Sequence, residues 1–406
     1  MTDDRSASAQ IRSPQDVELH AQLLGHADVK RVNEAIERQE QEGAMGTRRR
    51  LLATSVRLSK QMAPELHRMA SVCGDRLGLN IPLELYVFSS PQFNAACVKP
   101  EEGRLFVMFS SSILEGFSEA ELQFVMGHEL GHYIYGHHDI PIGYLMRGAA
   151  RPVSPRLALD LSSWSRFAEV SADRAGAHCS EGLEPVAHSL FKLASGLTGD
   201  FVHFDLDAFL RQVDEMQFEA DDPTASAPAE DWFLTHPFSP IRVKALKLFF
   251  ESELMSGEVS SADLELGVQG IMSLMEPSYL EGRTSNAESM RRLLFAAAVA
   301  LVHASGTVDD RERNVFEQFF GANSLSDKLN IKRTIATLED RATTVLENTT
   351  RAQRMQVIRD LCVLARADGR VDPTECAVLR DIAAKLDIGR FFVDRTLDDL
   401  AAAELD

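Results

Sequence analysis

The 406-residue sequence contains few cysteines, and their arrangement excludes a disulfide framework. There are five, an odd number, and they are widely scattered without any C-x-x-C pair. Their positions are Cys73, Cys97, Cys179, Cys362 and Cys376. Such usage is typical of a reducing compartment, so we expect a cytoplasmic protein.

Long apolar runs are also missing. The most apolar stretch, residues 293–304, is much shorter than the roughly 20 residues that a membrane-spanning helix needs. The opening residues, MTDDRSASAQ, lack the basic, apolar and small-residue order of a secretory signal. We therefore expect a soluble chain without a transmembrane segment.

Basic side chains are outnumbered, with 42 Lys and Arg against 61 Asp and Glu, for a net charge of −19. This acidity would repel nucleic acid and anionic membranes, and we expect neither as a partner. Hydrophobic residues make up 45% and charged residues 25%, which is ordinary for a globular protein and excludes disorder as the main state. The length predicts two to three domains of about 100–200 residues each.

The pattern along the chain divides it into four regions. We expect a loose polar arm at 1–45, a mostly α domain with a small β-sheet (α+β) at 46–255, a linker at 256–287 and an all-α domain at 288–406. The division follows the change from mixed to purely helical patterning.

Local signals place the elements of the second region. Segments 83–89 and 104–110, rich in Val, Phe and Tyr, are predicted strands, and 99–103 is a predicted turn. Ser118 and Glu121 form an S-x-x-E capping box, which predicts a helix that runs to about Gly136. A second long helix is predicted at 157–177.

The predicted helix after Ser118 carries the motif H-E-L-G-H at 128–132, an H-E-x-x-H sequence. His128 and His132, at i and i+4, project from one helical face and can reach one Zn²⁺ at about 2.0–2.1 Å. The motif follows a strand and a capped helix start, which is the context it requires. A zinc ion there would make hydroxide available near neutral pH, with Glu129 as general base and then acid. A histidine-rich surface helix is the alternative.

A catalytic zinc needs a third protein ligand, and the first candidate is His138. It stands where the metzincin pattern has its third histidine. That pattern needs a glycine at the position of Tyr135, whereas Gly136 comes one residue later. We therefore interpret His138, and also His137 beside it, as structural or surface residues.

The second candidate is Glu169, and we predict it as the third ligand. Glu169 and Asp173 are spaced i and i+4, so they share one face of the second predicted helix. Asp173 would accept a hydrogen bond from a ligand histidine and fix its orientation. A solvated acidic helix face is the alternative interpretation.

Together, H-E-L-G-H and the E-x-x-x-D-R-x-G sequence at 169–176 resemble the HtpX-type and CAAX-prenyl-endopeptidase family of gluzincin zinc metallopeptidases. The resemblance extends over residues of about 50–250. N-A-A at 94–96 is similar to the family's edge-strand motif, and T-H-P at 235–237, followed by Arg242, is similar to its late T-H-P…R motif. Relatives of this type usually carry membrane spans, which this sequence lacks.

The resemblance implies a zincin-type fold and a metalloendopeptidase with one Zn²⁺ per chain. It implies that the backbone of Asn94, Ala95 and Ala96 binds an extended peptide by strand addition. It also implies that His236 or Arg242 supports the oxyanion of the reaction, with His236 preferred. The expected substrate is a peptide or an unfolded or misfolded protein.

Cys97 follows the predicted substrate strand. We interpret it as a small strand residue, and a latency switch through thiolate–zinc coordination is the alternative.

The last region contains a repeat. Segments 304–312 and 367–375 share the pattern A-[SD]-G-x-V-D-x-x-E, which resembles the TerB-like helical module of tellurite-resistance TerB and DjlA proteins. The acidic residues are expected to cap helices, and a second divalent-metal site is the alternative. They are Asp309, Glu312, Asp368, Asp372 and Glu375. We expect this domain to regulate the enzyme or to bind a protein partner.

Two functions of other classes stay open at this point. One is a non-proteolytic zinc scaffold that binds peptides, and the other is a stress-linked adaptor that acts through the TerB-like domain. The presence of Glu129 favours the enzyme, since a site that only held zinc would not need this carboxylate.

Overall fold

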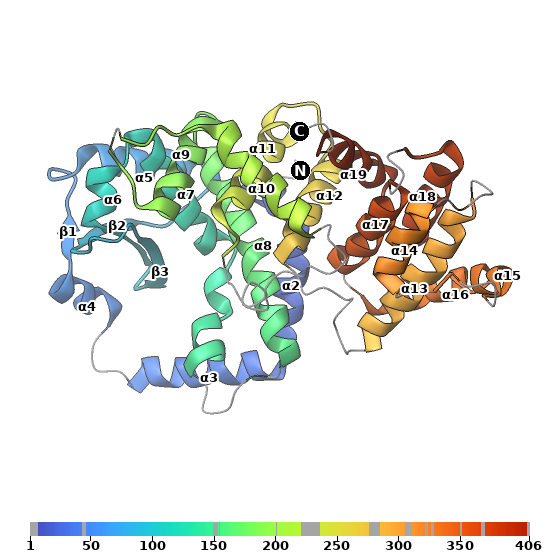
Figure 1. Cartoon of the computed structure of the whole chain (residues 1–406). Helices are drawn as coiled ribbons and strands as arrows, with labels where there is room; N and C mark the ends of the chain where they lie inside the picture. Colours follow the sequence, from blue (N-terminus) through green and yellow to red (C-terminus); the bar gives the residue numbers. More distant parts are fainter. Residues whose placement is uncertain are drawn as a thin grey trace, which may run out of the picture. The chain divides into compact units, whose positions relative to one another are not determined.

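The structure is a computed structural model, and it describes residues 7–42, 46–148, 153, 155–199, 201–220, 236–275, 285–304, 308, 310–320, 324–325, 329–349, 351–366 and 370–403. The chain forms two compact units (Figure 1). The first comprises residues 1–211 and 233–261, and the second comprises residues 212–232 and 262–406. In the part of the chain that is described, no helix is long and apolar enough to cross a membrane.

The first unit contains a four-stranded sheet in the order β1-β2-β4-β3. Its strands are β1 (Val56–Leu58), β2 (Leu83–Phe88), β3 (Ala95–Glu101) and β4 (Arg104–Ser110). β2 and β4 are parallel, and the other neighbours are antiparallel. The predicted strands at 83–89 and 104–110 are confirmed, and β3 forms one edge of the sheet.

β3 and β4 form a tight hairpin whose turn is shorter than the one predicted at 99–103. Residues 99–101 belong to β3, and Glu101 pairs with Arg104. The two residues between them, Glu102 and Gly103, have φ values of 51° and 71°. Positive φ at both central residues is typical of a type I′ turn, whose twist matches that of the strands it joins.

The helices of the first unit are α1 (Ala7–Ile11), α2 (Pro14–Gly25), α3 (Ala27–Glu42), α4 (Thr47–Thr54), α5 (Pro64–Leu77), α6 (Ser111–Gly116), α7 (Glu119–Ile134), α8 (Pro155–Cys179), α9 (Leu183–Ser195) and α11 (Ser239–Phe250). α10 (Leu206–Ala220) spans the division between the units. α7 begins at the predicted capping box: the Ser118 hydroxyl accepts from the Glu121 N–H, and the Glu121 carboxylate accepts from the Ser118 N–H. This confirms the predicted start of the helix.

Glycines bring α7 and α8 into close contact. A Cβ on Gly127 would lie 2.9 Å from the Cα of Gly176, and a Cβ on Gly131 would lie 2.8 Å from the Cβ of Ala175. A Cβ on Gly176 would lie 2.7 Å from the ring and the carbonyl oxygen of Phe124. The two helices therefore meet backbone to backbone, and this contact fixes how side chains of α7 face those of α8.

The loose arm expected at residues 1–45 is wrong for its described part, which forms α1, α2 and α3. α2 packs on α8, and the side chains of its Leu19 and Leu23 are buried. Asp16 of α2 is also fully buried. The prediction failed because apolar residues are sparse here, and a polar residue that is buried and paired looks in a sequence like a solvated one.

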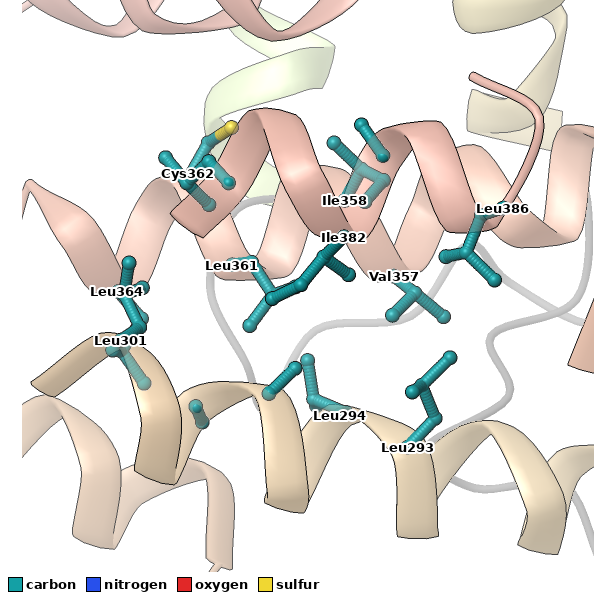
Figure 2. Packing of buried hydrophobic residues seen from close by; sticks show 14 of the residues in the cluster. Leu293, Leu294, Leu301, Val357, Ile358, Leu361, Cys362, Leu364, Ile382 and Leu386 are labelled. Atoms are coloured by element: carbon teal, nitrogen blue, oxygen red, sulfur yellow. The ribbon is translucent and has the colours of Figure 1, made fainter. Parts of the chain in front are cut away.

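The second unit is all-α, as predicted for 288–406. Its helices are α12 (Ser261–Met272), α13 (Ser285–Val302), α14 (Asp310–Phe320), α15 (Ile331–Ile335), α16 (Leu338–Asn348), α17 (Arg351–Ala365), α18 (Pro373–Lys385) and α19 (Arg390–Ala403). Figure 2 shows its core, where Leu293 and Leu294 of α13 face Val357 and Leu361 of α17. α12 lies within the predicted linker 256–287, yet a Cβ on its Gly270 would lie 2.9 Å from the Phe392 ring.

The second acidic repeat caps α18. The Asp372 carboxylate accepts from the Thr374 N–H at 2.8 Å, and the Glu375 carboxylate accepts from the Asp372 N–H at 2.8 Å. These contacts are those of the capping interpretation. Asp309, Asp368 and the side chain of Glu312 lie outside the described residues.

We expect Gly176→Ala to destabilise the protein. Its new Cβ would overlap Phe124, and overpacking of this kind costs about 1–3 kcal/mol, more than the roughly 1 kcal/mol gained by removing a helical glycine. Gly74→Ala in α5 is the matched control, since its Cβ would meet only Leu79 at 3.9 Å. Chemical denaturation measures both, and equal effects would contradict the close contact of α7 with α8.

Candidate metal centre

α7 and α8 bring three potential metal ligands together. His128, His132 and Glu169 offer ligand atoms that all lie within 4.8 Å of one another. The two Nε2 atoms are 3.1 Å apart. The carboxylate of Glu169 lies 3.4 Å from Nε2 of His132 and 3.6 Å from Nε2 of His128. These are the three residues that the sequence predicts as ligands.

The hydrogen bonds around these residues fit a cation. Nδ1 of His128 lies 2.9 Å from the Asp173 carboxylate, which can only accept, so the proton of the ring is on Nδ1 and Nε2 carries a lone pair. Oε2 of Glu169 is buried and accepts no hydrogen bond from any described residue. Two imidazoles and a carboxylate at one point are a donor set that zinc prefers.

Arg242 holds Asp173 in place. Its Nε and Nη2 donate to the two carboxylate oxygens at 2.8 and 2.6 Å. Burial alone would raise the pKa of Asp173, but the Arg242 guanidinium and the hydrogen bond with His128 bring this pKa below its usual range. Asp173 is therefore an anion that accepts from His128. The contact of Arg242 in the structure is with this carboxylate, where the sequence suggested support of the oxyanion.

Glu129 lies outside the ligand set and faces the edge strand. Its Oε2 accepts from the Cys97 N–H at 2.9 Å, and Nε2 of His138 donates to the Cys97 carbonyl at 2.8 Å. His138 is therefore bonded to β3, and Glu169 lies beside the two histidines as the third potential ligand instead. Burial, and then the charge of Glu129, raise the pKa of the Cys97 thiol, which opposes the thiolate needed for a latency switch.

Of the three residues predicted to bind substrate, Ala95 presents its backbone to the open side of β3. The Asn94 N–H donates to the Ser110 hydroxyl at 3.0 Å, and its carbonyl accepts from the Ser110 N–H at 2.8 Å. Backbone groups alternate in direction along an antiparallel strand. The backbone N–H and carbonyl groups of Cys97 point away from β4. The backbone groups of Ala96 therefore point toward β4, and those of Ala95 point away from it again.

His236 precedes α11 and lies beside the ligand set. Its Nε2 is 3.3 Å from Oε1 of Glu169, and its side chain is 66% exposed. The structure thus brings the late motif to the site as the resemblance implied. Thr235, the first residue of that motif, lies outside the described residues.

Asp16 adjoins the site without a signal in the sequence that linked it there, and His137, which the sequence predicts to be a structural or surface residue, adjoins it too. Gly136, with φ of 69°, follows the end of α7 and turns the chain so that Nδ1 of His137 lies 2.8 Å from Nδ1 of His132. Nε2 of His137 lies 3.1 Å from the Asp16 carboxylate. Burial lowers the pKa of His137 to about 4 despite this carboxylate. Asp16 belongs to the segment that the sequence presented as a polar arm.

Two cavities reach the ligands at successive positions along β3. The smaller, of about 270 Å³, includes Ala95 and Glu129, and the larger, of about 760 Å³, includes Lys99 and residues of α3. Both are lined by His132, His138, Glu169 and His236. The apolar wall of the smaller cavity consists of Phe93, Ile113, Phe124, Val125 and Leu193.

Comparison with known proteins agrees with this site. Residues 60–249 match the model of peptidase family M48, and residues 291–393 match that of tellurite resistance protein TerB. The plastoglobule-localized metallopeptidase 48, chloroplastic, of Arabidopsis thaliana is 28% identical over 211 residues, which cover 48% of this chain and 59% of the relative. A protease HtpX homolog of Ralstonia nicotianae is 30% identical over 168 residues, which cover 34% and 58%.

The chain thus spans less than two thirds of the length of these curated relatives, 59% and 58%. No solved structure matches it. Both family models agree with the resemblances in the sequence, and each falls on one of the predicted domains. Residues 60–249 are therefore a peptidase family M48 domain, and residues 291–393 are a TerB domain.

Proposed function

We propose that the chain is a zinc-dependent metalloendopeptidase. The observation that carries the proposal is the position of Glu129, which lines the same cavity as His128, His132, Glu169 and the edge strand β3. A carboxylate beside a zinc site, but outside its ligand set, is the group that peptide hydrolysis requires. The two relatives are named as a metallopeptidase and a protease, which supports the same activity.

His128, His132 and Glu169 would hold the metal, and Zn²⁺, when bound, supplies Lewis acidity toward water and toward a peptide carbonyl. Glu129 would take the proton of the attacking water on its Oε2 and pass it to the amine that leaves. Its present hydrogen bond from Cys97 keeps that carboxylate beside the strand along which the peptide would lie.

The neighbouring residues would orient the site and stabilise charge. Arg242 and Asp173 keep Nδ1 of His128 protonated and thereby direct its Nε2 to the metal. His236 is exposed next to Glu169, so it can donate to the oxygen of the scissile carbonyl as negative charge develops there.

The substrate would be an extended segment of an unfolded or misfolded protein. An extended peptide can pair with the outward backbone groups of Ala95, which needs a chain without structure of its own. Cavities at successive positions along β3 leave room on both sides of the ligands, which favours cleavage within a chain over trimming of its ends. The apolar wall of the smaller cavity suits an apolar side chain next to the cleaved bond.

The TerB domain would regulate this activity or recruit a partner. Its support is its separate core, which makes the second unit a module of its own. The cytoplasmic location stays a prediction from the sequence.

Glu129→Gln tests the catalytic assignment. Because the amide cannot take a proton from water, we expect cleavage of casein to fall by about 10²- to 10⁴-fold while one zinc per chain is retained. Glu115→Gln in α6 makes the same chemical change at an exposed residue outside the cavities and should retain activity. If the wild type and Glu129→Gln bind zinc equally and neither cleaves casein, the result would favour the alternative function, a zinc scaffold that only binds peptides.

Removal and return of zinc test the ligand set. Zinc at 100 times its Kd should add about 2.7 kcal/mol to the free energy of unfolding, because the unfolded chain lacks the site. We expect the rise in Tm to disappear in His132→Ala and to remain in His138→Ala, since His138 bonds β3. Loss of the response in His138→Ala alone would contradict the assignment.

Ala95→Pro tests strand addition. Proline removes the outward N–H and is tolerated at an edge strand, so kcat/KM for a peptide should fall by up to about tenfold with zinc content unchanged. Ala95→Ser keeps the N–H and is the matched control. Equal kcat/KM in Ala95→Pro and wild type would show that the substrate does not pair there.

A further inference from the structure

A chain of hydrogen bonds leads from His132 to α2. Nδ1 of His132 is 2.8 Å from Nδ1 of His137, and Nε2 of His137 is 3.1 Å from Oδ2 of Asp16. Asp16 lies before residues 60–249, the segment that matches the peptidase family. α2 thus reaches the ligand set through one intervening imidazole, that of His137.

The donors and acceptors in this chain permit one arrangement that leaves His132 able to bind a metal. A carboxylate only accepts, so Nε2 of His137 must carry a proton, and Nδ1 of the neutral ring must then accept. In the metal-bound state His132 would therefore donate from its own Nδ1, and its Nε2 would offer its lone pair to a metal held beside Glu169. Reversed protons would put a hydrogen on Nε2 of His132, the atom that a metal needs.

Asp16 is built to remain an anion in this place. Its side chain is fully buried, and it accepts from Nε of Arg12 at 2.7 Å and from Nε1 of Trp164 at 3.0 Å. Burial alone would raise the pKa of Asp16, but the hydrogen bonds with His137 and Arg12 hold this pKa well below its usual range. Three donors surround the two carboxylate oxygens.

Further hydrogen bonds hold α1 and α2 in place around this contact. The Ser13 N–H donates to the Ser171 hydroxyl of α8 at 3.1 Å, and the Tyr135 hydroxyl donates to the Ser8 carbonyl at 2.9 Å. Nε2 of His20 lies 3.1 Å from the Gly136 carbonyl, next to His137 itself. These bonds fix the position of Asp16 relative to the turn that carries His137.

We propose that Asp16 is a positioning residue for the metal centre. It acts through His137 and keeps Nε2 of His132 free for the metal. Only the assignment of His132 as a ligand is taken from the proposed function. In each ligand histidine a carboxylate then keeps the proton on Nδ1. Asp173 does so directly for His128, and Asp16 does so through His137 for His132. The helices before the peptidase segment are thereby part of the metal site.

The test is Asp16→Asn in the full chain, read by zinc affinity in competition with a chelator. Asparagine is neutral and has one acceptor oxygen for three donors, so it holds the proton on Nε2 of His137 less firmly than the carboxylate does. We expect the zinc Kd to rise by about 10- to 100-fold, the range for loss of a carboxylate that orients a ligand histidine. Asp28→Asn in α3, a partly exposed carboxylate paired with Arg31, is the matched control and should bind zinc like the wild type.

A second measurement needs no variant. Nitrogen-15 NMR of the imidazoles in the zinc-loaded wild type should show His137 protonated on Nε2 and His132 on Nδ1. The opposite tautomers, or a zinc Kd of folded Asp16→Asn equal to that of wild type, would overturn the proposal. Denaturation of the metal-free variant separates the two roles, because a purely structural Asp16 would lower stability and leave the Kd unchanged. Neither readout uses proteolysis. If the protein binds zinc and cleaves nothing, the proposed activity is refuted, and the role of Asp16 can still be tested.

Discussion

The metal centre depends on the backbone contact between α7 and α8. His128, Glu129 and His132 lie on α7, and Glu169 and Asp173 lie on α8, so the centre exists only where the two helices cross. Glycines at the crossing remove the side chains that would hold the helices apart. A wider separation would move a carboxylate away from the imidazoles, since helical side chains have a fixed reach. The glycines in H-E-L-G-H and in D-R-x-G are therefore as much a part of the site as its ligands.

The charged groups of the site are buried, and a buried charge is costly unless it has a partner. Asp173 has Arg242 and His128, and Asp16 has Arg12, Trp164 and His137. Glu169 differs: Nη2 of Arg242 forms an ion pair with its Oε2 at 3.4 Å, but this oxygen accepts no hydrogen bond from any described residue. A cation bound between the two Nε2 atoms and this carboxylate would compensate that charge.

Two nearby residues of the edge strand β3, Ala95 and Cys97, differ in what their outward backbone groups contact. Cys97 gives both of its outward backbone groups to Glu129 and His138, which fixes the proposed general base against the sheet, whereas Ala95 keeps its groups on the open side. One strand therefore holds the proposed base and the proposed substrate-binding edge at a set spacing. The second unit has a separate core around α13, α17 and α18 (Figure 2), so its packing is that of a module of its own.

The sequence by itself determined what depends on short spacing. The i, i+4 histidines, the capping box at Ser118, the strands at 83–89 and 104–110 and the helical second domain all follow from local periodicity and local hydrogen bonding. It also indicated Glu169 and Asp173, because their spacing puts both on one helical face. Only the tertiary structure decided that Arg242 bonds Asp173, that Ala95 faces outward, and that Asp16 reaches His137 from a segment expected to be a loose arm. Those contacts join residues far apart in the chain, and a buried polar side chain differs from a solvated one only in the partners that folding brings to it.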